Sequence, residues 1–248
     1  AAPIEVHYWP TPNGWKVTIA LEEMGLGYDV KPVNIGAGEQ FDDAFLKISP
    51  NNKIPAIVDR RPDDGGQPLA MFESGAILEY LSEKTGQLVP PNLRERWQTI
   101  QWLHWQMGGF GPMLGQNHHF KQYAPEKLPY AIERYDKEAE RLYGVMDDRL
   151  KDHDFLAGEY SIADIACYPW AKLHERHGVD INELPHVKRW LEAIGERPAV
   201  KRAYEKAEDI NTDPVVSEIL EREDVYLDEA EGLVTVSEDI LPLEPHSR

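Results

Sequence analysis

Cysteine is almost absent from this sequence, because Cys167 is the single one among 248 residues. One cysteine excludes an intramolecular disulfide and fits a reducing compartment, so we expect the protein in the cytoplasm. The sequence also lacks an apolar run of the roughly 20 residues that a membrane-spanning helix needs, and it lacks a basic leader followed by an apolar stretch. These absences predict a soluble protein with no membrane partner.

Basic residues are few: 26 Lys and Arg stand against 44 Asp and Glu, so the net charge is −18. Affinity for nucleic acid comes largely from basic side chains that displace counterions from the phosphates. The charge balance therefore argues against nucleic acid as a partner. Much of the acidic charge lies in residues 213–248, which we interpret as a solvated C-terminal extension.

The first part of the chain has the pattern of a thioredoxin-like domain, which we assign to residues 1–88. Apolar alternation and helical spacing, interrupted by Gly and Pro, predict its strands and helices. The expected order is strand, helix, strand, strand, strand and helix, over residues 4–8, 15–24, 28–35, 54–59, 68–72 and 74–85. A strand, a helix and a strand in succession normally form a parallel pair with a right-handed crossover.

Strand patterns end before residue 93, and amphipathic helical spacing takes over. We therefore expect an all-helical domain over residues 93–212, joined to the first domain by Pro90-Pro91-Asn92. Its predicted helices cover residues 94–107, 130–151, 162–177 and 187–197. With 42% hydrophobic residues, the chain can bury a sizeable core in these two domains.

Two segments of the first domain suit a peptide-like ligand. Pro55 cannot donate a ladder hydrogen bond, so it marks a strand edge or a cis bond that leaves the Ile54 backbone open to an added peptide. Ser74 can cap the next helix while free N–H groups there bind a carboxylate, and Glu73 offers a counter-charge to an ammonium. The local pattern alone favours an ordinary helix start. Together the segments favour a site for an amino acid head group, such as the γ-glutamyl end of glutathione.

These segments carry a family resemblance. Residues 49–59 and 73–77 resemble the glutathione-binding signature of the glutathione transferases. Further likeness, over residues 10–14, 111–120 and 129–135, is to the bacterial nu class, which includes a disulfide-bond reductase. The resemblance covers about residues 4–207. It implies a thioredoxin-like domain followed by a helical bundle, glutathione as the cofactor with one or two molecules per active site, and a homodimer.

The protein supplies no obvious redox thiol of its own. A thioredoxin-like domain that does redox work normally has two cysteines at the turn before its first helix, and Thr11-Pro12-Asn13-Gly14 stands there instead. Cys167 lies inside a predicted helix, where a buried and inert thiol is expected. The reacting sulfur must then come from bound glutathione.

Thr11 and Asn13 lie at the start of the first predicted helix, where the helix dipole favours anions and polar donors can hydrogen-bond a thiolate. Thr, Asn and Gly are also ordinary turn residues, so the pattern alone leaves a purely structural role open. The resemblance implies that Thr11 and Asn13 are the catalytic residues, in place of the tyrosine that many transferases use. Tyr8 alternates with Val6 and Ile4 and is interpreted as a core residue.

The resemblance also implies a set of glutathione-binding residues, namely Gln40, Lys53, the Ile54 backbone, Glu73, Ser74 and, from the neighbouring subunit, Arg134. The sequence leaves another role open for Arg134, because it can pair with Glu138 one helical turn away. We expect Tyr123 to line the substrate pocket. His118 and His119 are adjacent and point in different directions, which argues against a metal site. Asp164 completes a capping box with Ser161 and should be structural.

The sequence thus predicts an enzyme that uses bound glutathione thiolate to reduce a small disulfide. An alternative within the same fold is a lyase that cleaves a glutathione thioether, as in aromatic or lignin aryl-ether catabolism, with release of glutathione disulfide. A third alternative, from another class, is a noncatalytic binding protein, because one fold hosts many functions.

Overall fold

The structure is a computed structural model that describes residues 1–210, 227–228 and 233–234. The predicted acidic extension therefore lies outside the described residues except for two short strands. These are β5 (Leu227–Asp228) and β6 (Leu233–Val234), which pair antiparallel.

The first half of the described chain holds the four-stranded sheet and its helices. In chain order these are β1 (Ile4–Tyr8), α1 (Pro12–Met24), β2 (Tyr28–Pro32), η1 (Ile35–Ala37), η2 (Glu39–Phe41), α2 (Asp43–Leu46), β3 (Ala56–Asp59), β4 (Leu69–Phe72) and α3 (Ser74–Thr85). The rest, up to residue 210, is helical. Its elements are α4 (Leu93–Trp105), η3 (Gln106–Phe110), α5 (Gly111–His118), η4 (His119–Tyr123), α6 (Pro129–Leu150), α7 (Ile162–Ala171), η5 (Ile181–Glu183), α8 (Pro185–Gly195) and α9 (Pro198–Ile210).

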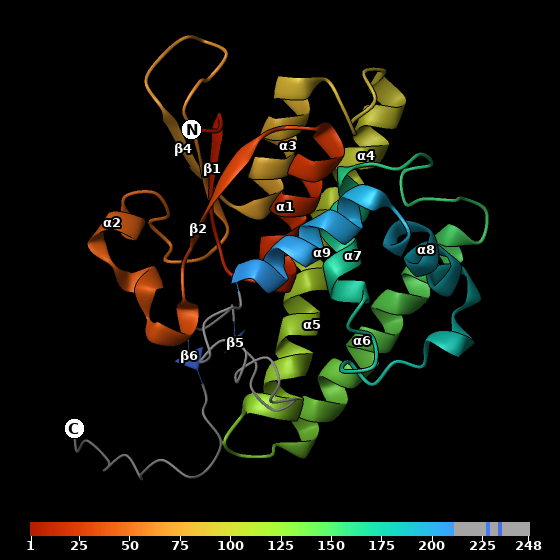
Figure 1. Cartoon of the computed structure of the whole chain (residues 1–248). Helices are drawn as coiled ribbons and strands as arrows, with labels where there is room; N and C mark the ends of the chain where they lie inside the picture. Colours follow the sequence, from red (N-terminus) through yellow and green to blue (C-terminus); the bar gives the residue numbers. More distant parts are fainter. Residues whose placement is uncertain (211–226, 229–232, 235–248) are drawn as a thin grey trace, which may run out of the picture.

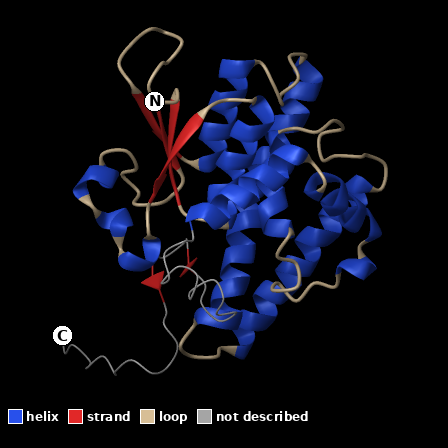
Figure 2. Ribbon diagram, in the orientation of Figure 1, coloured by secondary structure: helices blue, strands red, loops and turns tan. Residues whose placement is uncertain are grey.

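The sheet confirms the predicted thioredoxin-like fold. Its strand order is β2-β1-β3-β4, with β1 parallel to β2 and the other neighbours antiparallel. The parallel pair is joined through α1, as the sequence predicts. Figure 2 shows these strands gathered on one side of the molecule and helices filling the other side.

Helix α1 joins the two parts of the molecule. Thr11 caps it, Pro12 occupies its first turn, and Gly25 ends it with φ 68°. A side chain at Gly14 would place its Cβ 2.2 Å from the Trp9 carbonyl oxygen, so only glycine allows α1 to start this close to β1. The buried side of α1 includes Val17, Ile19, Ala20 and Leu21. Figure 1 shows α1 between the sheet and the second group of helices, where it contacts α7 and α9.

The helical part differs from the prediction in three places, one of which is α9, a helix that the sequence pattern did not predict. The predicted helix at 94–107 continues through a π-helical turn, η3, into α5 and η4, where Gly108, Gly109, Gly111 and Pro112 obscured the helical pattern. The predicted helix at 162–177 ends at Ala171. Pro169 cannot donate a helical hydrogen bond, and the chain leaves the helix two residues later. No helix of the described part is long and apolar enough to cross a bilayer.

Candidate active site

A cavity of about 300 Å³ lies between the sheet domain and the helical domain. A volume of this size falls at the lower end of the range for small-molecule sites. Its walls come from the start of α1, the segment before β3, the start of α3, and the helices η3, α5, η4 and α7. The lining residues are Pro12, Asn13, Lys16, Lys53, Ile54, Pro55, Phe72, Glu73, Ser74, Gln106, Met107, Gly111, Pro112, Gly115, Gln116, His118, Tyr123, Trp170 and Leu173.

The cavity brings together six of the nine residues that the sequence and the resemblance assigned to the site: Asn13, Lys53, Ile54, Glu73, Ser74 and Tyr123. Three others lie elsewhere. Thr11 and Gln40 are buried outside the lining, and Arg134 is exposed on α6. Of these three residues, Thr11 has hydrogen bonds that indicate a specific local role.

Thr11 uses its hydroxyl to cap α1. Its Oγ1 accepts a hydrogen bond from the Gly14 backbone N–H at 3.3 Å, and the hydroxyl donates to the Trp9 carbonyl at 3.4 Å. The side chain is 4% exposed. Two backbone partners thus surround the hydroxyl, and its observed role is to fix the start of α1, one residue before Pro12 and two before Asn13.

Asn13 is half-buried at the first turn of α1 and faces the cavity. Its Oδ1 accepts a hydrogen bond from the indole Nε1–H of Trp170 at 3.0 Å. The amide therefore lies where the positive end of the α1 dipole meets the cavity, a position that favours an anion.

The second wall is the segment before β3. The Ile54–Pro55 peptide bond is cis, one of the two arrangements that the sequence suggested. Ser49 is fully buried, and its hydroxyl donates a 2.7 Å hydrogen bond to the Lys53 carbonyl, which holds the loop in place. This wall of the cavity therefore includes the backbone of Ile54 and the positive charge of Lys53.

The third wall is the start of α3. Glu73 has φ 70° and ψ 110°, a conformation that is costly for a residue with a side chain, and such strain concentrates at functional sites. Its carboxylate makes no hydrogen bond that caps the helix. The first intrahelical backbone bond is donated by Ile77 to the Glu73 carbonyl, so the earlier N–H groups of the first turn have no acceptor within the helix. The start of α3 therefore places backbone N–H donors beside the Glu73 carboxylate.

Lys16 is a site residue that the sequence reasoning missed. It is 1% exposed, and its Nζ donates to Ser74 Oγ at 3.2 Å and to Gln106 Oε1 at 3.1 Å. It therefore ties α1 to the start of α3 and to η3, and brings a positive charge to the cavity. In the sequence, the one indication of this role was that Lys16 lies next to Val17, on the apolar side of a short helix.

Tyr8 and Cys167 match their expected structural roles. Tyr8 is fully buried in the core, and burial raises the pKa of its phenol. Burial also raises the pKa of the Cys167 thiol well above its ordinary value, which disfavours the reactive thiolate. Neither side chain lines the cavity. Among the described residues, no group of three or more His, Cys, Asp or Glu is arranged to hold a metal ion.

His118 lines the cavity in its neutral form. Burial and, to a smaller extent, the nearby charges of Arg176 and Lys121 lower its pKa to about 3. Its ring stacks on His177 with centroids 4.4 Å apart. The pKa of His118 is lower in the folded protein than in the unfolded chain. Its contribution to the free energy of unfolding is therefore fully present above about pH 6.5 and decreases as the pH falls toward 3.

We therefore expect His118→Gln to flatten the acid limb of the stability curve. Between about pH 6 and pH 4, the wild-type free energy of unfolding should change by about 1.4 kcal/mol per pH unit more than that of the variant. Urea unfolding at several pH values measures this difference. His104→Gln, on the exposed side of α4, is the matched control. Parallel curves for wild type and His118→Gln would contradict the prediction.

Both parts of the chain resemble known protein families. The family models described as glutathione S-transferase, N-terminal domain, and glutathione S-transferase, C-terminal domain, match residues 11–84 and 112–198. Disulfide-bond oxidoreductase YfcG of Escherichia coli (strain K12) is 56% identical over 206 residues, which cover 83% of this chain and 96% of the relative. Disulfide-bond oxidoreductase YghU of the same strain is 44% identical over 215 residues, covering 81% and 73%.

Solved structures give the same picture. A glutathione transferase from Pseudomonas putida, with one glutathione disulfide bound per subunit, has a TM-score of 0.78 and 44% identity, covering 82% of this chain and 90% of that one. A family member from Pseudomonas fluorescens, with two glutathione molecules bound, has a TM-score of 0.76 and 46% identity, covering 81% and 91%.

Proposed function

This chain belongs to the glutathione S-transferase family, and on that premise we propose that it is a glutathione-dependent disulfide-bond reductase. The observation that carries the proposal is the cavity in which Asn13, Ile54, Glu73 and Ser74 meet. The two Escherichia coli relatives are named disulfide-bond oxidoreductases, and the Pseudomonas structures hold glutathione or its disulfide. The chain brings no accessible thiol within its described residues, so glutathione is the source of the reacting sulfur.

The cavity walls suit the two ends of glutathione. We propose that the first-turn N–H groups of α3, with Ser74, hold the carboxylate of the γ-glutamyl end, and that Glu73 pairs with its ammonium. The Ile54 backbone would pair with the peptide as an added strand does. Lys53 and Gln40 complete the proposed binding set, although Gln40 is buried and is not a lining residue of the cavity. Tyr123 would line the pocket for the second substrate.

Asn13 is the proposed catalytic residue for the thiol. A free thiol with a pKa of about 8.5 is only a few per cent thiolate at neutral pH, so a lower pKa raises the reactive fraction. The Asn13 amide and the N-terminal end of α1 both favour the anion. We propose that Thr11 serves the same end indirectly, by capping the helix that carries Asn13.

The overall reaction needs two molecules of glutathione for each disulfide. The first thiolate attacks one sulfur of the substrate, forms a mixed disulfide and releases the other sulfur as a thiolate, which takes up a proton. The second glutathione attacks the mixed disulfide. Glutathione disulfide forms, the second substrate sulfur leaves as a thiol, and two electrons have passed from glutathione to the substrate.

The test is steady-state turnover with glutathione on two substrates in parallel, a small model disulfide and a glutathione thioether of an aromatic ketone. We expect rapid disulfide reduction and no thioether cleavage. Preferential thioether cleavage would identify a lyase. Inactivity on both substrates, with retention on immobilised glutathione, would identify a binding protein.

Cys167→Ala should leave turnover within about twofold of wild type. Cys167 is fully buried in α7, and the proposed mechanism takes its thiol from glutathione. The measurement is kcat/KM for disulfide reduction, with wild type treated with a thiol-alkylating reagent as a second arm. A loss of more than tenfold in the well-folded variant would show that the protein thiol takes part.

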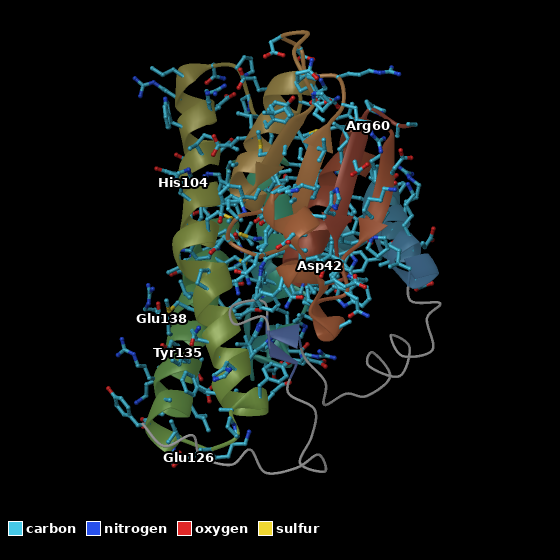
Figure 3. All side chains as sticks on the ribbon, turned by 90° about the vertical axis from the view of Figure 1, so that its left-hand side faces the viewer. Asp42, Arg60, His104, Glu126, Tyr135 and Glu138 are labelled. Carbon is cyan, nitrogen blue, oxygen red and sulfur yellow. The ribbon has the colours of Figure 1, made fainter. Side chains whose placement is uncertain are left out.

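We further propose a homodimer. Large apolar side chains remain exposed on β4, α4 and the start of α6: Leu69, Phe72, Leu93, Trp97 and Tyr130. Figure 3 shows His104 of α4 and Glu138 of α6 along the same side of the molecule. Arg134 is exposed on α6, one turn from Tyr130, and so belongs to a surface that a second subunit can cover. In that arrangement Arg134 would reach the glutathione carboxylates of the partner site.

Mixing two impaired variants tests this arrangement. Asn13→Ala and Arg134→Ala should each be poorly active, yet a mixed dimer has one site with both residues intact. Random pairing of subunits then restores about one quarter of wild-type turnover, because half of the dimers are mixed and each has one good site. Co-expressed, differently tagged chains supply the mixture. If Arg134 served its own subunit, mixing would restore nothing.

We also propose a cellular compartment and a subclass for this protein. A protein that consumes reduced glutathione and carries one buried cysteine fits a reducing compartment, and we infer the cytoplasm. The segments at 10–14, 111–120 and 129–135 support assignment to the nu class.

A further inference from the structure

A buried hydrogen bond between Lys16 and Ser74 lies at the wall of the cavity. Lys16 is part of α1, and Ser74 is the first residue of α3, 58 positions later in the sequence. The Nζ of Lys16 lies 3.2 Å from the Oγ of Ser74, and both residues line the cavity. Their exposed fractions are only 1% and 6%. Because Ser74 is proposed to hold the carboxylate of the γ-glutamyl end, Lys16 contacts that proposed site through the hydroxyl.

The chemistry of lysine fixes the direction of this bond. An ammonium group only donates, whereas a serine hydroxyl has one hydrogen to donate and an oxygen that accepts. The oxygen of Ser74 therefore accepts from Lys16, and its own hydrogen is directed elsewhere. That hydrogen is donated to the Sδ of Met107 at 3.7 Å. Because a thioether sulfur is a weak acceptor, a carboxylate oxygen that enters the cavity would take its place.

Lys16 is held in position by the helical domain. Its Nζ also donates to the Oε1 of Gln106 at 3.1 Å, and Gln106 is fully buried in η3. A Cβ at Gly111 would lie 2.6 Å from the Nε2 of Gln106, so glycine at this position makes room for the amide. In such close packing the ammonium group keeps a set position relative to Ser74.

We propose that Lys16 is a positioning residue that sets the Ser74 hydroxyl as a donor, and thereby makes this end of the cavity specific for a carboxylate. This role rests on the proposed function, in which Ser74 binds the γ-glutamyl end of glutathione. In a series where Lys16 donates to Ser74 and Ser74 donates to the carboxylate, each donor polarises the next and strengthens both bonds. The ligands selected are thiols whose γ-linked residue carries a free α-carboxylate.

The test compares the binding of three thiols to wild type and to Lys16→Met by isothermal titration calorimetry. The first is glutathione. The second has a γ-aminobutyryl group in place of the γ-glutamyl group, so it lacks only the α-carboxylate, and the third is γ-glutamylcysteine, which lacks the glycine. The preference of wild type for glutathione over the second thiol should fall about tenfold in the variant, because a hydrogen bond to a charged group contributes about this factor.

The preference for glutathione over γ-glutamylcysteine should stay within about twofold, because Lys16→Met leaves the γ-glutamyl end of both thiols identical. If the variant merely loosened the cavity, it would weaken all three thiols by the same factor and leave both preferences unchanged. That result would overturn the proposal.

Lys31→Met is the matched control, since Lys31 is exposed on β2 and does not line the cavity. It removes the same charge from the protein and should leave all three affinities within about twofold of wild type. An equal loss of the carboxylate preference in this control would indicate a general effect of net charge, and the role of Lys16 would be wrong.

Ser74→Ala tests the same role if Lys16→Met does not fold. This variant removes the hydroxyl through which Lys16 acts and leaves the lysine in place. It should lose the preference for the α-carboxylate by about the same factor, and the double variant should lose no more than about twofold further. A Ser74→Ala protein that keeps the wild-type preference would overturn the proposal.

Failure of this role and failure of the proposed function give different results. Calorimetry measures binding without turnover, so the preference is tested independently of the rate of disulfide reduction. A wild-type protein that does not bind glutathione would remove the proposed function, and the role of Lys16 with it. A wild-type protein that binds glutathione, and whose carboxylate preference survives Lys16→Met, would remove only the role of Lys16.

Discussion

Asn13→Ala is expected to lower kcat for glutathione-dependent disulfide reduction by about 100-fold at neutral pH, because loss of a donor to a reacting anion costs about this much in other enzymes. The amide stands at the N-terminal end of α1 and faces the cavity. Its loss should raise the pKa of the bound thiol and leave fewer thiolates to react. Steady-state kinetics over a range of pH and glutathione concentration measures the effect.

The affinity for glutathione should change little in this variant, because the walls at Ile54 and Glu73-Ser74 are untouched. Asn51→Ala is the matched control, since Asn51 is exposed on the loop before β3 and does not line the cavity. A variant that binds glutathione weakly but keeps its kcat would assign Asn13 to binding. A variant with wild-type kinetics would remove it from the site.

The second large effect concerns stability. Asp164→Ala should lower the free energy of unfolding by about 3 kcal/mol or more, because each buried donor left without a partner costs about 1–3 kcal/mol. Asp164 is fully buried and accepts hydrogen bonds from the backbone N–H groups of Leu156 and Ser161 and from the indole of Trp190, at 3.0, 3.0 and 2.8 Å. Denaturant unfolding, with the exposed Asp154→Ala as control, measures the loss.

The pH dependence of this loss has a definite sign. Burial raises the pKa of Asp164 to about 6, and its hydrogen bonds offset only part of that rise. The folded protein then binds a proton more tightly than the unfolded chain between about pH 4 and pH 6, so ionisation of this group lowers stability as the pH rises through that window. The alanine variant should lack this component. An Asp164→Ala protein as stable as wild type would contradict the structural role.

Local patterns in the sequence were sufficient for most of the sheet domain. The alternation at 4–8 and the stop at Gly25 depend on neighbouring residues, and β1 and the end of α1 lie where they were predicted. The predicted turn at 10–14 was too long, because α1 begins at Pro12, and β2 ends at Pro32 rather than at residue 35. The capping box at Ser161 and Asp164 was predictable for the same reason, since its partners are three residues apart. The local pattern did not predict the hydrogen bond that the indole of Trp190 donates to Asp164, because Trp190 lies 26 residues away in the sequence.

The helical domain was harder to predict where Gly and Pro interrupt the pattern. Helix α5 contains Gly111, Pro112 and Gly115, which have low intrinsic helix propensity. Packing against α6 and the cavity walls outweighs that propensity, and no local rule reports such packing. Helix α7 ends early for the converse reason, because Pro169 interrupts its backbone bonding inside an otherwise apolar run.

The residues of the candidate site also differ in whether their signal in the sequence is local or depends on distant contacts. Asn13, Ile54, Glu73 and Ser74 line the cavity, and the sequence could propose them because short motifs at a helix start or a strand mouth carry their chemistry within a few residues. Lys16, Gln106 and Trp170 were not found, because their roles come from contacts across 58 to 157 positions of sequence. The sequence contains the residue types of the proposed thiolate site, but the burial of Lys16 and the hydrogen bond from Trp170 to Asn13 depend on which helices pack together. That packing exists only in the folded molecule.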